Sequence, residues 1–254
     1  MAGVTAAVEL MGHGIIVHPM WVLALDTTTA AGSAALAEGT RVLEVAALDP
    51  TQPVATRVPR DLIAILERHA VQLAQINLFA VATGPGSFTG LRIGIAAMQG
   101  LALAEGKPLV GVSTFEALAS LATPRARLEG EARVTVWIDA WRGEVYAATW
   151  AHDAVGDVLR MVGEPTVDHP DALLATSAAS DALFVGDGAV RYRDRLRRVV
   201  QPTPLVAGAV ASIARARAEA GECPPPHAIR PLYVRRPDAE LAAERRKAAD
   251  GAAR

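Results

Sequence analysis

Apolar and polar positions in the first third of the chain change period once, and that change predicts strands followed by a helix. Short apolar runs bounded by turn residues predict three strands, at Trp21 to Asp26, Gly32 to Ala37 and Arg41 to Leu48. Apolar residues then recur at intervals of three and four, which predicts an amphipathic helix from about Pro59 to Ile76. This part of the chain therefore begins as three strands and a helix.

The next forty residues alternate between buried strands and apolar helices. Leu78 to Ala82 predicts a strand, which a glycine-rich turn at 84–90 joins to a helix ending near Glu105. That helix is apolar on nearly all sides, so we expect it to be covered on more than one side, by its own sheet or by a partner. A strand at Pro108 to Val112 and a helix from Ser113 or Thr114 to Leu121 complete the order βββαβαβα.

The same order of elements starts again after residue 131. Residues 123–131 contain Pro124, Gly130 and several charges, and this composition predicts a linker between two lobes, residues 20–122 and 132–240. In the second lobe the predicted strands and helices are, in chain order, the strands 134–139, 144–150 and 158–162, a helix at 170–175, a strand at 182–185, an arginine-rich helix from Gly186 to about Arg198, and a helix at 207–220. We predict an α/β fold of two lobes, each with a mixed sheet.

Composition excludes several broad classes of protein. The chain has 254 residues, of which 51% are hydrophobic, and its formal net charge is −2, so disorder is not the dominant state. A single cysteine excludes a disulfide within the chain. Residues 1–19 lack the positive start of a secretory signal and are expected to be a poorly ordered extension, and residues 241–254 a charged tail. No apolar run is long enough to cross a bilayer, which makes a cytoplasmic location the expectation.

The glycine-rich turn is the sharpest motif, and its spacing favours a structural role. Gly84, Pro85, Gly86, Ser87 and Gly90 lie between a predicted strand and a predicted helix. The spacing of the glycines does not match a phosphate-binding P-loop, a dinucleotide-binding fingerprint or a nucleophile elbow. We therefore predict a tight strand-to-helix turn, with the hydroxyl of Ser87 or of the neighbouring Thr89 capping the helix.

Two aspartates are weak candidates for a nucleotide site. Asp26 and Asp139 each end the first strand of a lobe, where a two-lobed nucleotide-binding enzyme could hold phosphate and a metal. Trp141 and Arg142 follow Asp139 where a phosphate loop needs small residues, which counts against tight binding. No two histidines have the spacing of a helical metal site, so neither a metal nor another cofactor is predicted.

One cluster of basic residues stands out from the balanced charge of the chain. Five arginines fall between Arg191 and Arg198. On a helix they would spread around most of the circumference and form a solvated face, with contact to phosphate or tRNA as the alternative.

Five sequence blocks together resemble the TsaB (YeaZ) family. They are LALDTTTAAGS at 23–33, GPGSFTGLR at 84–92, GVSTFEAL at 111–118, DAWRGEVY at 139–146 and PLYVRRPDA at 231–239. They occur in the order of the family, and the second block is the most specific. Trp141 departs from the arginine common in the family.

The resemblance implies a two-lobed actin-like ATPase (ASKHA) fold and a role in making threonylcarbamoyladenosine in tRNA. It implies a non-catalytic subunit that binds the catalytic subunit TsaD, that meets the ATPase TsaE and tRNA through the complex, and that can form a homodimer when alone. Partner contact would fall on the two helices of the first lobe, and the candidate residues are Ile63, Leu66, Leu91, Ile95 and Met98. The alternative is an ATP-dependent phosphotransferase of the same fold, using Asp26 and Asp139 around a magnesium ion.

Overall fold

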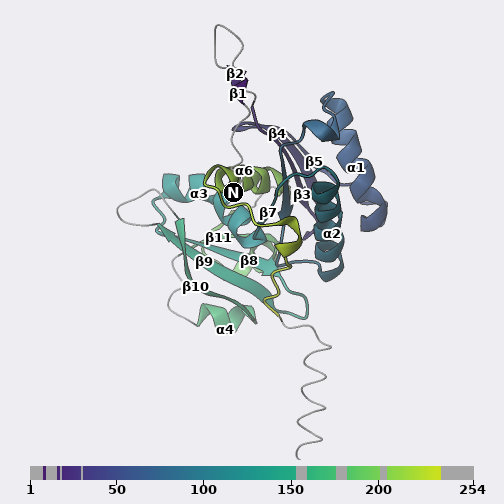
Figure 1. Cartoon of the computed structure of the whole chain (residues 1–254). Coiled ribbons are helices and arrows are strands. Elements are labelled where there is room, and N and C mark those ends of the chain that lie inside the picture. The colour runs from purple at the N-terminus through teal and green to yellow at the C-terminus, as the bar shows by residue number, and fades with distance from the viewer. Residues whose placement is uncertain are drawn as a thin grey trace, which may run out of the picture.

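A computed structural model of the chain describes residues 8–9, 16–17, 19–29, 31–152, 159–175, 182–200 and 205–235 (Figure 1). Two short strands near the start, β1 (Val8–Glu9) and β2 (Ile16–Val17), pair antiparallel. Most of the predicted extension 1–19 and all of the predicted tail 241–254 lie outside the described residues. Within the described residues, no helix is long and apolar enough to cross a membrane.

The first lobe is built on a five-stranded mixed sheet with the strand order β5-β4-β3-β6-β7. The antiparallel part consists of β3 (Trp21–Asp26), β4 (Ser33–Glu38) and β5 (Arg41–Ala47). The parallel part adds β6 (Leu78–Ala82) next to β3, and β7 (Leu109–Val112) next to β6. Strands β3 and β6 are buried nearly throughout, as expected for central strands covered on both faces.

The second lobe repeats this plan with the strand order β10-β9-β8-β11-β12. Its antiparallel strands are β8 (Arg133–Asp139), β9 (Val145–His152) and β10 (Leu159–Asp168). Its parallel strands are β11 (Leu183–Val185) and β12 (Val199–Val200). Both lobes therefore follow the predicted order βββαβαβα.

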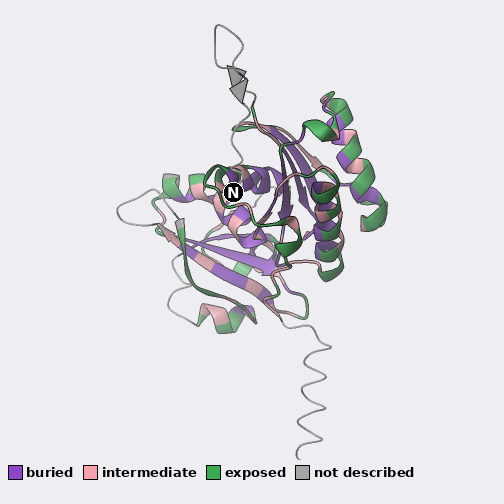
Figure 2. Cartoon of the chain, viewed as in Figure 1, coloured by how far each residue is buried: buried purple, intermediate pink, exposed green. Residues whose placement is uncertain are grey.

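Helices and sheets alternate in layers, and the middle layer ties the lobes together. Helices α1 (Val54–Arg68) and α2 (Phe88–Ala104) cover the outer face of the first sheet (Figure 1). Helices α3 (Thr114–Glu129) and α6 (Ala207–Glu219) lie between the two sheets in one shared hydrophobic core (Figure 2). The short helices α4 (Pro170–Leu174) and α5 (Asp187–Arg191) belong to the outer side of the second sheet.

The two middle helices pack on the sheet of the opposite lobe. Helix α3 follows β7 of the first lobe, yet it contacts β8 and β11 of the second. Helix α6 is the last helix of the second lobe, yet it contacts β3, β4, β6 and β7 of the first. Ser33 adds a polar contact, because its Oγ accepts a hydrogen bond of 3.1 Å from the backbone N–H of Ala207 at the start of α6. This exchange of helices makes the lobes interdependent.

Three predicted boundaries were wrong because packing outweighed local sequence signals. Helix α1 begins at Val54 rather than Pro59 and ends at Arg68, and residues 73–75 form a separate turn of 3₁₀ helix, η1 (Leu73–Gln75). The buried Val58 belongs to the same apolar face as Leu62 and Ile65, so the periodic pattern extends back past the proline. Pro59 itself is exposed, which limits the steric cost of its place inside the helix.

The predicted linker at 123–131 is mostly helical. Helix α3 continues through Pro124 to Glu129 and ends at Gly130, whose φ of 68° suits glycine. Ala119, Ala122 and Ala126 are buried at helical spacing, and this apolar face holds the helix in place past the proline. The connection between the lobes is therefore short.

The predicted arginine-rich helix is also shorter than expected. Helix α5 ends at Arg191, and a turn of 3₁₀ helix follows, η2 (Arg193–Arg195). The chain then extends so that β12 can pair in parallel with β11. The sheet hydrogen bonds of β12 require this extended backbone, which a longer helix would have prevented.

Candidate functional site

The first candidate aspartate, Asp26, lies at the end of β3 and is fully buried. Its Oδ1 accepts hydrogen bonds from the backbone N–H of Thr28, at 2.8 Å, and from the Thr28 hydroxyl, at 2.6 Å. Its Oδ2 accepts one from the Thr29 hydroxyl at 3.1 Å. Both carboxylate oxygens are therefore engaged by the turn that joins β3 to β4.

The glycine-rich turn closes over this same hairpin. The backbone N–H of Ser87 donates to the carbonyl of Thr28 at 2.8 Å, and the Thr27 hydroxyl donates to the carbonyl of Gly90 at 2.8 Å. A β-carbon at Gly86 would lie 2.4 Å from the Thr28 carbonyl oxygen, and one at Gly90 would lie 2.1 Å from that of Thr27. The glycines are thus required for backbone-to-backbone approach.

The start of α2 is capped by the chain itself. The Ser87 hydroxyl accepts a hydrogen bond of 3.2 Å from the backbone N–H of Gly90, which is the capping contact predicted for Ser87 or Thr89. On the other side of the turn, the Gly84 carbonyl accepts from the backbone N–H of Thr114 at 2.8 Å. The glycine-rich turn therefore packs directly on the hairpin that follows Asp26.

Burial raises the pKa of the Asp26 carboxyl, and the hydrogen bonds from Thr28 and Thr29 only partly oppose this shift. An acid whose pKa is higher in the folded than in the unfolded protein destabilises the fold progressively as the pH rises above its unfolded pKa, near 3.8. Replacing Asp26 by asparagine removes this titration but preserves the shape of the side chain. The stability of Asp26→Asn relative to the natural chain is therefore expected to rise with pH above about 4, until the Asp26 carboxyl ionises in the folded protein, as measured by urea unfolding. A difference that is independent of pH would contradict the raised pKa.

The second candidate aspartate, Asp139, is held by an arginine. Its Oδ2 lies 2.7 Å from a guanidinium nitrogen of Arg191, and its Oδ1 accepts from the backbone N–H of Trp141 at 3.0 Å. Trp141 and Arg142 both have a φ of 56°, a left-handed conformation that is uncommon for residues other than glycine. The Trp141 side chain is 54% exposed. This hairpin thus presents a bulky side chain to its surroundings.

No functional role was predicted for Asp187 from the sequence, but the structure places its side chain beside Asp139. The Asp187 Oδ1 accepts hydrogen bonds from the backbone N–H groups of Asp139, at 3.0 Å, and Gly188, at 2.8 Å. Burial raises the pKa of the Asp187 carboxyl. A β-carbon at Gly186 would lie 2.2 Å from the Trp137 carbonyl oxygen, so this Gly-Asp-Gly turn closes on β8 as the first glycine-rich turn closes on β3. In the sequence, the feature that could have identified Asp187 is its place in a Gly-Asp-Gly turn directly after a predicted strand.

Metal ligands are not clustered in the described part of the chain. No group of three or more His, Cys, Asp or Glu side chains there could hold a metal ion. His13 and His18 lie outside the described residues.

The five candidate residues for partner contact separate into core and surface. Leu66, Ile95 and Met98 are buried in the core between the two helices and the first sheet, and Leu91 is buried beside Gly84 of the glycine-rich turn. Their contact with a partner stays a prediction, and in the isolated chain their apolar surface is already covered. Ile63 is 55% exposed on the outer face of α1.

The outer face of α2 is apolar and uncovered in the isolated chain. Leu103 is 60% exposed, and the exposed residues one and two turns before it are Gly100 and Ala96. Nothing lies within 4 Å of a β-carbon built at Gly100. The sequence predicted that this helix would be covered on more than one side, and the chain covers it with the first sheet, with α1 and with the 3₁₀ turn η3 (Pro226–Ala228). Small residues on the other side permit close approach of another helix.

Comparison with known proteins identifies similar chains. Residues 55–243 match the family model described as TsaD, tRNA N6-adenosine threonylcarbamoyltransferase. The chain is 41% identical over 140 residues to the tRNA threonylcarbamoyladenosine biosynthesis protein TsaB of Escherichia coli (strain K12), an alignment that covers 54% of this chain and 58% of that protein. It is 36% identical over 179 residues to the protein of the same name from Haemophilus influenzae, covering 67% of this chain and 73% of the relative.

A solved structure shows the same architecture. YeaZ from Pseudomonas aeruginosa superposes with a TM-score of 0.68 at 29% sequence identity, covering 84% of this chain and 99% of that structure. Together with the family match, this similarity confirms the two-lobed actin-like fold that the sequence blocks implied. The alignment with the Escherichia coli relative spans less than two thirds of that protein's length.

Proposed function

This chain belongs to the TsaB (YeaZ) family, and from that membership we propose that it is a non-catalytic subunit of the tRNA threonylcarbamoyladenosine-modifying complex. The observation that carries the proposal is the closed hairpin at Asp26, in a chain otherwise similar to proteins named for this biosynthesis. Because the proposed complex acts on tRNA, the proposal includes a cytoplasmic location for this chain.

The geometry of both hairpins supports a non-catalytic role. At Asp26 both carboxylate oxygens accept hydrogen bonds from the turn that follows, and the glycine-rich turn packs against Thr27 and Thr28 of that turn. At Asp139 the carboxylate is paired with Arg191. A phosphotransferase of this fold would need carboxylates that are free to hold a metal and nucleotide phosphates. These contacts therefore favour the subunit over the phosphotransferase.

The partner in the proposal is a TsaD-like catalytic subunit, docked on α1 and α2. The exposed apolar residues Ile63 and Leu103 lie on these two neighbouring helices, and the small residues of α2 allow a partner helix to pack closely (Figure 1). A TsaE-like ATPase and tRNA would then join through the complex. In the isolated protein, a homodimer through the same surface would cover the same apolar side chains.

Reconstitution tests the proposal directly. Threonylcarbamoyladenosine formation is measured with tRNA, ATP, threonine and bicarbonate, first with all proteins of the system, then without this chain, and then with this chain but without the TsaD-like subunit. We expect product only in the complete reaction, because in the proposal this chain supports the TsaD-like subunit and does not transfer the group itself. The readout is the modified nucleoside after digestion of the tRNA, quantified by mass spectrometry.

The same reaction distinguishes the phosphotransferase. Product formation that is unchanged without this chain would contradict the proposal. ATP turnover by this chain alone, abolished by Asp26→Ala, would support the phosphotransferase instead. A matched Ser87→Ala variant, which changes the neighbouring turn but no carboxylate, controls for loss of folding.

A further inference from the structure

Two aromatic side chains hold an arginine near the start of α2. The guanidinium carbon of Arg92 lies 3.9 Å from the centroid of the Phe88 ring, and Arg92 Nε donates a hydrogen bond of 3.0 Å to the Tyr233 hydroxyl. The two rings also contact each other, with their centroids 5.5 Å apart. These three residues, called the aromatic cluster below, orient the guanidinium group through a cation–π contact and a hydrogen bond.

The backbone that carries Tyr233 is fixed on the first lobe. The backbone N–H of Leu232 donates to the carbonyl of Thr83 at 2.7 Å, and the side chain of Gln99, in α2, donates to the carbonyl of Ile229 at 3.1 Å. The ring is therefore held in place before any partner binds. An arginine oriented in this way loses less conformational entropy on binding than one that extends freely into water.

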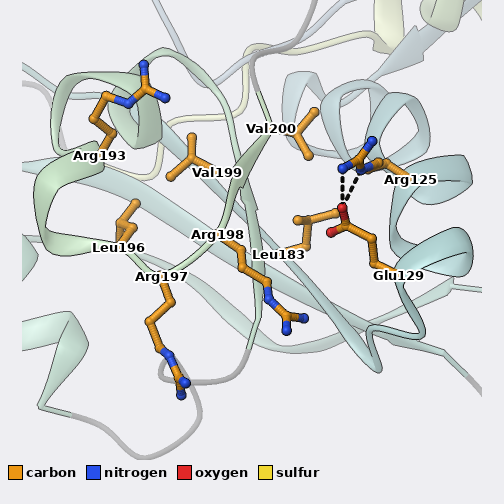
Figure 3. A pocket seen from close by; sticks show the side chains of 9 residues that line it. All are labelled: Arg125, Glu129, Leu183, Arg193, Leu196, Arg197, Arg198, Val199 and Val200. Atoms are coloured by element: carbon orange, nitrogen blue, oxygen red, sulfur yellow. Dashed lines mark hydrogen bonds and ion pairs between the residues drawn. The ribbon is translucent and has the colours of Figure 1, made fainter.

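Most of the hydrogen-bonding capacity of Arg92 is unused. A guanidinium group has five N–H groups, and in the described part of the chain only the Nε–H of Arg92 has an acceptor. The pocket between α3 and the segment after α5 shows the contrast, because Arg125 is paired there with Glu129 (Figure 3). Arg92 has aromatic rings in place of such a glutamate, so its two Nη groups are available to a ligand.

The composition of the aromatic cluster is typical of a protein interface. Tyr, Phe and Arg are enriched where proteins meet, and Phe88 and Tyr233 are 44% and 38% exposed. A planar guanidinium group binds a carboxylate through two parallel hydrogen bonds. A nucleic acid strand would require further positive charges along its path, whereas Arg92 is the only charged residue of α2. The ligand that fits is therefore a single carboxylate on a protein surface.

The aromatic cluster lies at one end of the exposed face of α2. Arg92, Ala96 and Gly100 are exposed at intervals of four residues and so share one side of the helix, and Leu103 is exposed one turn further on. A rise of about 1.5 Å per residue separates Arg92 from Leu103 by about 16 Å along the helix axis. A partner helix that lies along α2 would meet a cation at one end and an apolar side chain at the other.

We propose that the aromatic cluster binds a carboxylate of the TsaD-like subunit, from an aspartate or glutamate side chain, through the two Nη groups of Arg92. The inference rests on the proposed function, since that function supplies the partner that docks on α1 and α2. It adds a charged anchor to the apolar contacts of Ile63 and Leu103. Because charge pairs fix the register of an interface, this anchor would set where the partner lies along α2.

Calorimetric titration of the full chain with the TsaD-like subunit tests the inference. Arg92→Gln is expected to weaken binding by about tenfold to a hundredfold at about 50 mM KCl, and to reduce the salt dependence of the Kd up to about 500 mM. Arg92→Lys keeps the charge but loses the planar fork, so it should recover only part of the affinity. The matched control Arg193→Gln removes one charge from an exposed position in the second lobe and should change the Kd less than about twofold.

Tyr233→Phe separates orientation from charge. It removes the hydroxyl that accepts from Arg92 Nε but leaves the ring and every charge in place. This variant is expected to weaken binding by about threefold and to retain the salt dependence of the natural chain.

Each other result overturns the inference. Natural affinity of Arg92→Gln would exclude the aromatic cluster from the interface and leave the proposed function intact. Weaker binding with an unchanged salt dependence would mean that Arg92 only holds Tyr233 on α2. Natural affinity between the subunits, with loss of tRNA binding by the assembled complex, would assign the cluster to RNA. Failure of the natural chain to bind the TsaD-like subunit would contradict the proposed function as well.

Discussion

Replacement of Gly90 by alanine is expected to lower the free energy of unfolding by about 3 kcal/mol or more. The added β-carbon would lie 2.1 Å from the carbonyl oxygen of Thr27, and that atom belongs to the backbone of the buried hairpin. Neither side can give way cheaply, because the Thr27 hydroxyl is bonded to the carbonyl of Gly90 itself. Relief would require α2 to move away from β3. Urea unfolding followed by circular dichroism measures the change.

The control for this prediction lies in the same helix. Gly100→Ala introduces the same atom at an exposed position, where nothing lies within 4 Å of it. Alanine is favoured over glycine inside a helix, so Gly100→Ala should raise the free energy of unfolding by about 0.5 to 1 kcal/mol. The two substitutions are therefore expected to have opposite signs. A Gly90→Ala variant as stable as the natural chain would mean that the turn does not need this close approach.

The order of elements could be predicted from the sequence because each element carries its own local signal. The strand before the glycine-rich turn is continuously apolar, and the turn itself contains glycines at positions that only a tight strand-to-helix connection requires. The boundaries at Pro59 and Pro124 could not be predicted in the same way. Proline signals the end of a helix locally, and what keeps the helices intact is burial against other elements, which depends on the fold.

The exposure of the candidate partner-contact residues was harder to predict for a related reason. An amphipathic pattern identifies which side chains avoid water, but it does not identify what covers them. Ile63 and Leu66 lie one turn apart on the same helix. Only the structure shows that Ile63 is exposed and that Leu66 is in the core. The role of Asp187 was missed because its partner, the backbone N–H of Asp139, is 48 residues away in sequence. Contacts between residues so far apart in sequence depend on the order of strands in the sheet, which local sequence patterns do not give.

Replacement of both exposed apolar residues by aspartate, Ile63→Asp/Leu103→Asp, is expected to weaken binding of the TsaD-like subunit by about a hundredfold or more. Both side chains are more than half exposed in the isolated chain, so the change should have little effect on its own folding. In the complex, each carboxylate would be buried against an apolar partner without a counter-charge, at a cost of about 2 kcal/mol or more for each. Isothermal titration calorimetry gives the Kd, and reconstituted modification should fall with it.

The matched control places the same chemistry on the other lobe. Met161 and Val162 on β10 are exposed to a similar extent, 48% and 50%, and Met161→Asp/Val162→Asp adds the same two charges away from α1 and α2. If the partner docks on α1 and α2, only the first double variant loses affinity, while both retain the natural unfolding temperature. Equal affinity of the two variants would move the docking surface elsewhere, because no apolar interface that includes Ile63 and Leu103 could accept two unpaired carboxylates without loss. Loss of affinity in the α1 and α2 variant alone would also explain why the chain leaves Ala96, Gly100 and Leu103 of α2 exposed, because the partner would cover this remaining face of the helix.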